Sequence, residues 1–144
     1  MDTKLPNISV SLLKAFDQFS SGDLCGELFK KVYVTKEVVS PPSEAMKKGQ
    51  YLEYLCTGQG LRDGTIPTPD TTQKGELTAP YKVIAKQAER FKIHCKFHKV
   101  ETETTGEVME WEFEDGVKGK GISDIRGTVH GKRAIIDIKS TAFI

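Results

Sequence analysis

The stretch GISDIRGTVHGKRAIIDIKST, residues 121–141, decides how the rest of the chain is interpreted. Its runs of β-branched and apolar residues predict two strands, over residues 117–129 and 132–141. His130 and Gly131 between them suit a tight two-residue turn. We therefore expect an antiparallel hairpin near the end of the chain.

Three charged residues lie inside these apolar runs: Asp124, Asp137 and Lys139. Residues two apart in a strand share a face, so Asp137 and Lys139 project to the same side as Ile135. The hairpin returns the chain so that Asp124 lies within a residue pair or two of Asp137, although the register is not fixed by the sequence. We expect two carboxylates and one ammonium to converge on one face of the sheet.

Two interpretations of this convergence remain open. A divalent cation such as Mg²⁺ or Mn²⁺ favours carboxylate and carbonyl oxygens, so Asp124 and Asp137 are suitable ligands. Such an ion binds a phosphate oxygen and activates water, while Lys139 positions or deprotonates that water or stabilises charge on the phosphate. Alternatively, Asp137 and Lys139 form an exposed ion pair that contributes less than about 1 kcal/mol.

Helical periodicity dominates the first two thirds of the chain. The predicted helices cover residues 8–19, 24–31, 43–57 and 80–95, and residues 58–79 form a long Gly-, Pro- and Thr-rich loop. After the second helix, residues 32–35 (VYVT) are compatible with a strand.

From about Glu107 the periodicity changes to two, which predicts a further strand with Met109, Trp111 and Phe113 on its buried face. The 144 residues suffice for one domain, so we expect a single domain over residues 1–144. Helices followed by an antiparallel β-meander indicate an α+β fold, or an α/β core that the chain enters late.

The composition, with 38% hydrophobic and 28% charged residues, is ordinary for a soluble globular protein. There is no run of eighteen apolar residues and no hydrophobic signal core, so we expect a cytoplasmic protein with no membrane partner. Cys25, Cys56 and Cys95 are odd in number and widely spaced, which favours free thiols over a disulfide framework.

Basic residues gather in the fourth predicted helix, where residues 80–100 contain six Lys or Arg and one acid. The pattern is compatible with a solvated helix face or with a surface for a phosphate backbone. The candidate DNA contacts are Lys82, Lys86, Arg90, Lys92 and Lys96. His94 and His98, four residues apart on the same helix, have the spacing of a zinc site but are more simply polar or phosphate-facing groups.

The segments GISD and AIIDIKST together resemble the PD-(D/E)XK nuclease superfamily, specifically its RecB-like exonuclease branch. In that branch a G-x-x-D strand precedes a strand ending in D-x-K-[ST]. The segment ISVSLLKAFDQFSSGDLCGELFKKVYV resembles the opening helix of the branch and the segment that follows it. KKGQYLEYL resembles its G-x-x-x-E helix.

The resemblance implies a restriction-endonuclease-like core and Mg²⁺- or Mn²⁺-dependent hydrolysis of DNA phosphodiesters, of the exonuclease type used in recombination or repair. Under it Asp124, Asp137 and the carbonyl of Ile138 are metal ligands, Lys139 is the catalytic lysine, and Glu53 is a ligand or holds the water. A solvated helix glutamate remains the alternative for Glu53.

The chain departs from the family pattern at two points. Ser123 stands where the family motif has its proline, a variation that the superfamily tolerates. The branch has a further helix with a Gln-x-x-x-Tyr element, and this chain stops at Ile144 before it. We therefore expect a truncated domain, or a second copy or partner subunit that supplies the element. Some relatives hold an iron–sulfur cluster through one cysteine early in the chain and others late in it. Cys25 stands near the early position, but the late cysteines are missing, so no iron–sulfur cluster is expected.

Two other functions remain open. A catalytically inactive nucleic-acid-binding module of the same fold would bind DNA with a strong salt dependence and would not cleave it. A small-molecule or protein-interaction domain would bind neither DNA nor Mn²⁺.

Overall fold

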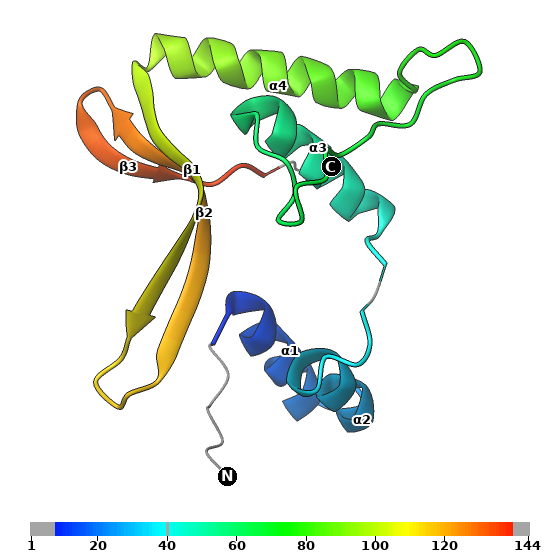
Figure 1. Ribbon diagram of the computed structural model, residues 1–144, viewed down its shortest axis with the longest axis vertical. Coiled ribbons are helices and arrows are strands. Elements are labelled where there is room, and N and C mark those ends of the chain that lie inside the picture. The colour runs from blue at the N-terminus through cyan, green and yellow to red at the C-terminus, as the bar shows by residue number, and fades with distance from the viewer. Residues whose placement is uncertain (1–7, 40, 140–144) are drawn as a thin grey trace. The chain divides into compact units, whose positions relative to one another are not determined.

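The computed structural model describes residues 8–39 and 41–139 (Figure 1). The helical elements precede the strands along the chain, and the sheet has the order β1-β2-β3. The mixed α+β composition and the antiparallel meander are therefore confirmed. No helix in the described ranges is long and apolar enough to cross a membrane. The elements are α1 (Val10–Ser20), α2 (Gly26–Phe29), the π-helical turn η1 (Lys30–Val34), α3 (Glu44–Thr57), α4 (Ala79–Phe97), β1 (Val100–Glu112), β2 (Lys118–Val129) and β3 (Lys132–Ile136).

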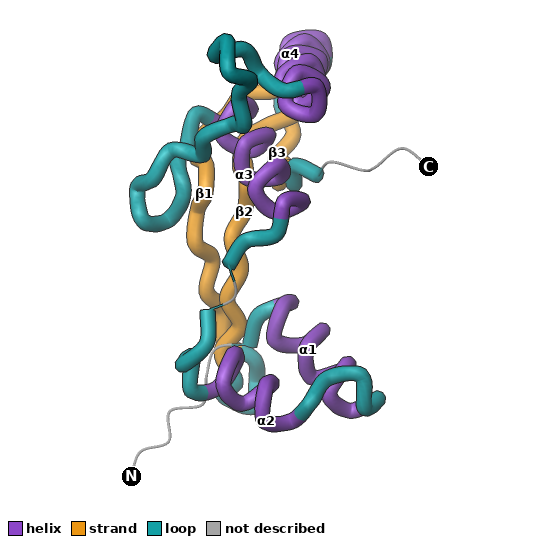
Figure 2. Tube along the Cα trace, turned by 90° about the vertical axis from the view of Figure 1, so that its right-hand side faces the viewer, coloured by secondary structure: helices purple, strands orange, loops and turns teal. Residues whose placement is uncertain are grey.

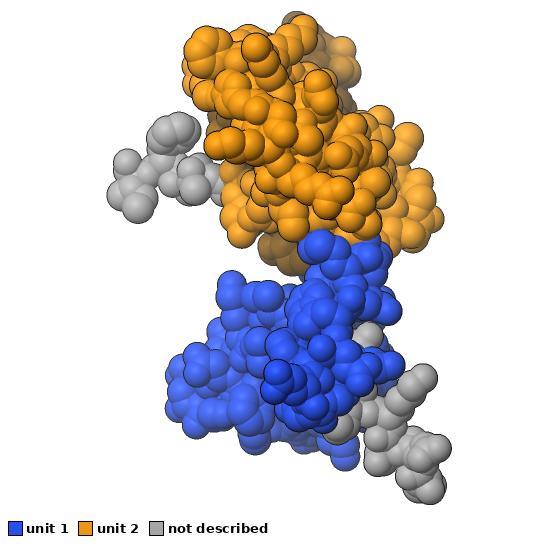
Figure 3. Space-filling view, turned by 90° about the vertical axis from the view of Figure 1, so that its left-hand side faces the viewer, with its two compact units in different colours: residues 1–41, 108–122 blue, residues 42–107, 123–144 orange. Residues whose placement is uncertain are grey.

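The chain divides into two compact units (Figure 3). Unit 1 comprises residues 1–41 and 108–122, and unit 2 comprises residues 42–107 and 123–144. Strands β1 and β2 each contribute residues to both units. The single domain expected from the length stays a prediction.

In unit 1, helix α1 begins at Val10, two residues after the predicted start, because the side chain of Ser9 caps it by accepting a hydrogen bond from the backbone N–H of Leu12 at 3.3 Å. The strand considered for residues 32–35 is wrong, since Lys30–Val34 form a π-helical turn. Phe29 and Tyr33 stack with ring centroids 5.5 Å apart. A helical backbone brings residues four apart together, whereas a strand separates them by about 13 Å.

Trp111 and Phe113 are 44% and 50% exposed, so the prediction that they lie in a core is wrong. The indole of Trp111 lies over two glycines of β2, Gly119 and Gly121. A Cβ atom at Gly119 would meet that ring at 2.1 Å. Trp111 thus covers a neighbouring strand that has no side chains of its own there.

Unit 2 has its core between α3 and α4, which pack against each other (Figure 1). Helix α3 agrees with the predicted range of residues 43–57. Ser43 caps it by accepting a hydrogen bond from the N–H of Met46 at 3.2 Å, and Gly58 ends it with a φ of 74°. Tyr51 and Tyr81 meet edge to face with centroids 5.4 Å apart. The buried cluster comprises Tyr51, Leu52, Tyr81, Ile84 and Ala88.

The connection between α3 and α4 is the predicted loop, drawn as a long teal tube in Figure 2. Within the described part of the loop, one isolated antiparallel β-bridge joins Thr71 and Leu77. Leu77 also packs against the α3–α4 core. The loop is therefore fastened to unit 2 just before α4 begins.

Strand β1 starts at Val100, earlier than the expected start near Glu107. Residues 100–105 (VETETT) lack the apolar alternation that was used to find the strand, so their strand structure depends on pairing with β2. Gly106 interrupts the regular backbone with a φ of 61°. The period-two alternation of apolar residues begins only after Gly106.

The predicted turn at His130 and Gly131 is confirmed, with φ values of 49° and 76°. Positive φ at both central residues is the requirement of a type I′ hairpin turn. Strand β3, however, ends at Ile136 and does not reach residue 141, and residues 140–144 lie outside the described ranges. Beyond the strand, Ile138 packs against the α3–α4 core.

We predict opposite effects for two glycine-to-alanine substitutions. In Gly127→Ala the new Cβ would meet the backbone oxygen of Glu101 in β1 at 1.9 Å, so the free energy of unfolding should fall by about 1–3 kcal/mol. In Gly49→Ala the new Cβ meets nothing within 4 Å in α3, so the helix should gain up to about 1 kcal/mol. Urea unfolding of both variants checks this; a Gly127→Ala protein as stable as the wild type would contradict the close approach of β1 and β2.

Candidate active site

The β2–β3 register aligns the two aspartates. The last paired residues are Ile125 and Ile136, so one further step of the same register sets Asp124 opposite Asp137. Like charges directly opposite each other destabilise a strand pair. This repulsion explains why β3 ends at Ile136, one residue before the two carboxylates would face each other.

Asp124 instead accepts a hydrogen bond from the backbone N–H of Ile138, with a distance of 2.6 Å from nitrogen to Oδ2. The bond ties the end of β3 to β2 through a side chain, where the strand ladder would have used a backbone carbonyl. Because Ile138 also packs against the α3–α4 core, this contact fixes the segment that carries Asp137 and Lys139.

Burial alternates along both strands, and the charged residues lie on the more exposed side. In β2, Ser123, Ile125 and Gly127 are buried, whereas Asp124 is half-buried and Arg126 is exposed. In the segment from β3, Ile136 and Ile138 are half-buried, and Ile135, Asp137 and Lys139 are exposed. The alternation predicted from the sequence therefore continues past the end of β3, with Asp124 and Asp137 on the same side.

Lys139 pairs with Asp137, with 2.5 Å between Nζ and Oδ2. The hydrogen bond and the charge of Asp137 raise the pKa of Lys139, and Asp124 adds to the effect. Both side chains are largely exposed, so the pair contributes little to folding stability. Its consequence is chemical, because Lys139 is held as an ammonium close to the carboxylates.

Glu53 on α3 belongs to the same electrostatic group. Partial burial raises its pKa, and the charges of Asp124 and Asp137 raise it further. All four predicted catalytic residues belong to unit 2: Glu53, Asp124, Asp137 and Lys139. Lys139 contacts Asp137, and the charges of both aspartates act on Glu53, but a single site formed by the four stays a prediction.

The described part of the chain contains no three His, Cys, Asp or Glu side chains already grouped so that they could hold one metal ion. Asp124 and Asp137 are occupied by the N–H of Ile138 and by Lys139. The donor set nevertheless suits a hard divalent cation, because it consists of carboxylate oxygens whose mutual repulsion a cation would relieve. Burial is the main cause of the raised pKa of Glu53, and the charges of the two aspartates add to it.

The basic residues predicted as DNA contacts occupy exposed positions on α4: Lys82, Lys86, Arg90, Lys92 and Lys96. Lys82 pairs with Glu76 at 3.3 Å. None of the five contributes to the shifted pKa of Glu53 or Lys139. Besides burial, Lys92 and Glu53 both act on the pKa of Cys56, with opposite signs. Contact of the five residues with DNA stays a prediction.

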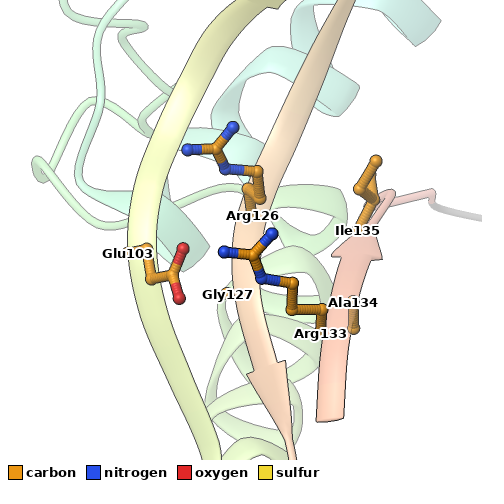
Figure 4. A pocket seen from close by; sticks show the side chains of 6 residues that line it. All are labelled: Glu103, Arg126, Gly127, Arg133, Ala134 and Ile135. Atoms are coloured by element: carbon orange, nitrogen blue, oxygen red, sulfur yellow. The ribbon is translucent and has the colours of Figure 1, made fainter.

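Two arginines near the carboxylates were missed by the sequence reasoning. Arg126 lies two residues beyond Asp124 in β2, and Arg133 lies four residues before Asp137 in β3. Both line a hollow of about 470 Å³ (Figure 4). Both arginines lie an even number of residues from Asp124 or Asp137, so the same period-two pattern predicts that they share a side of the sheet with the aspartates.

The histidine pair of α4 gains a third member from the β2–β3 turn. His98 Nδ1 lies 3.3 Å from His130 Nε2, and His94 stacks on His98 with centroids 6.2 Å apart. Cys95, between the helical histidines in sequence, is half-buried, and burial raises its pKa. A hydrogen bond between two imidazoles accounts for the contact without a metal ion.

We predict that Glu53→Gln removes part of the pH dependence of stability. A carboxyl whose pKa is higher in the folded state binds protons more tightly there. Stability therefore falls as the pH rises from the ordinary value of 4.5 through the raised pKa. Urea unfolding across this range should show a shallower fall in Glu53→Gln than in the wild type.

The matched control is Glu114→Gln, because Glu114 is an exposed glutamate in the β1–β2 turn. This variant should keep the wild-type slope. Equal slopes in all three proteins would show that Glu53 is not coupled to the aspartates.

Comparison with models of known protein families gives no match, and neither curated proteins nor solved structures show significant similarity to the chain. A functional assignment therefore depends on the geometry and chemistry of the carboxylate site.

Proposed function

We propose that the chain carries a metal-dependent DNA nuclease site of the PD-(D/E)XK type, within a restriction-endonuclease-like core of the RecB-like branch. The observation that carries the proposal is the β2–β3 register, which sets Asp124 level with Asp137 beside Lys139. The raised pKa of Glu53 supports it, because both aspartates contribute to that shift. The proposed reaction is phosphodiester hydrolysis of the exonuclease type, in recombination or repair.

In this proposal Asp124, Asp137 and Glu53 hold Mg²⁺ or Mn²⁺ together with the carbonyl oxygen of Ile138. The ion, when bound, lowers the pKa of a coordinated water and neutralises charge on the phosphate. Only the ionised carboxylate of Glu53 would be a good ligand, and the positive charge of a bound ion would favour that form. The half-buried position of Glu53 makes it the ligand most sensitive to the presence of the ion.

Lys139 acts as a cation in this proposal. Its raised pKa means that it stays protonated near neutral pH, which favours stabilisation of charge on the phosphate and orientation of the water over removal of a proton. Its side chain is 77% exposed, so little packing holds it to Asp137. A cation that engages Asp137 therefore frees Lys139 to turn toward the phosphate.

The test is cleavage of linear DNA in Mg²⁺ or Mn²⁺ by the wild type, Asp137→Asn and Lys139→Ala. We expect each substitution to lower the rate by about 100-fold or more, the scale seen when a charge-stabilising group is removed. Glu114→Gln is the control and should cleave like the wild type. Circular dichroism of each variant verifies folding, which should be intact because both substituted side chains are exposed.

Equal cleavage by all four proteins would reject the assigned site. Metal-independent, salt-sensitive DNA binding by a wild type that does not cleave would instead support an inactive nucleic-acid-binding module.

A further inference from the structure

The hollow on the exposed side of the sheet in unit 2 has a mixed lining (Figure 4). The side chains of Glu103, Arg126 and Arg133 project from three different strands toward it, and the helices lie behind the strands in this view. Its volume of about 470 Å³ falls within the usual range of ligand sites. The lining residues are Glu103, Arg126, Gly127, Arg133, Ala134 and Ile135.

The hollow continues from the carboxylate site along the same side of the sheet. Arg126 follows Asp124 by two residues and Ile135 precedes Asp137 by two, and the register pairs Arg126 with Ile135. Two residues along a strand correspond to about 6.5–7 Å. A polymer bound at the carboxylates therefore meets this hollow with its next unit.

Its two guanidinium groups differ in their partners. Arg126 is paired with Glu107 at 3.1 Å, whereas Arg133 has no ion pair within the described part of the chain. Guanidinium groups bind phosphate oxygens in a bidentate geometry, so Arg133 is the group available for a phosphate.

The rest of the lining is suited to the remainder of a nucleotide. Ile135 is 61% exposed at the mouth of the hollow, and Ala134 and Gly127 add small apolar surfaces. Glu103 contributes an acceptor for a sugar hydroxyl or a base amino group. The negative charge of Glu103 repels a second phosphate. The lining therefore fits a single nucleotide better than several inorganic anions.

We infer that this hollow binds one nucleotide of a DNA strand next to the phosphate held at the carboxylates. Arg133 contacts the phosphate of that nucleotide, and Ile135 contacts its sugar or base. The inference rests on the proposed nuclease function for the identity of the ligand. It assigns contact with the substrate strand to the β2–β3 hairpin, in addition to the basic residues of α4.

The test measures binding without cleavage. A fluorescein-labelled single-stranded oligonucleotide is titrated with protein in EDTA at several salt concentrations, and anisotropy gives the affinity. The variants are Arg133→Ala and its neighbour Lys132→Ala, which remove one positive charge each from exposed, consecutive positions of β3. Lys132 is not among the residues that line the hollow, so it serves as the control.

We expect Arg133→Ala to weaken binding about 5- to 10-fold and to reduce the slope of log affinity against log salt by about 0.7. Lys132→Ala should change the affinity by less than about 2-fold, because it removes the same charge without a phosphate contact. Ile135→Ala should lower the affinity and leave the salt slope unchanged, since it removes only an apolar contact.

Equal effects of Arg133→Ala and Lys132→Ala would overturn the inference, because charge alone would then account for binding. No effect of either variant, or no binding by the wild type, would also overturn it. The two proposals can fail separately. If the wild type does not cleave DNA but Arg133→Ala binds more weakly, the nucleotide site is supported and the nuclease is not. If the wild type cleaves with metal but Arg133→Ala binds as the wild type does, only the nuclease is supported.

Discussion

The two-residue turn at His130 and Gly131 fixes which residues of β2 and β3 face each other. Both residues have positive φ, which matches the twist of the flanking strands and leaves one register. A shift of one residue would move every side chain to the other side of the sheet. Three features depend on this register: the convergence of Asp124 and Asp137, the exposure of Lys139, and the lining of the hollow.

The same register brings together carboxylates that repel one another, and the local structure limits that repulsion. The ladder ends before Asp137, Asp124 binds the N–H of Ile138, and Asp137 pairs with Lys139. The pKa of Glu53 is raised mainly by burial, and the charges of Asp124 and Asp137 raise it further. Packing of Ile138 on the α3–α4 core holds the arrangement in place against this cost.

The sequence was sufficient for features that depend on local chemistry. The range of α3 and the turn at His130 agree with the predictions, because caps and turns follow from the backbone preferences of a few residues, such as Ser43 and Gly58 at the ends of α3. Features that depend on distant partners were missed. Residues 100–105 become a strand only by pairing with β2, and β3 stops because of a charge on the neighbouring strand. Trp111 was predicted to be buried because it alternates with polar residues, yet it is exposed. Alternation shows which residues share a face of the sheet, and it does not show what covers that face.

The candidate site was accessible from the sequence for the same reason that Arg126 and Arg133 were overlooked. Asp124, Asp137 and Lys139 stood out as charges among apolar neighbours, whereas an arginine in a strand is an ordinary surface residue. Only the register shows that Arg126 is level with Ile135, two residues along the strands from the aspartates. The density of positive charge along α4 favoured a larger basic surface, which the register does not relate to the aspartates. Under the proposed function, a DNA strand at the carboxylates would pass along the side of the sheet that Arg126 shares with them, so position in the register would matter as well as the density of positive charge.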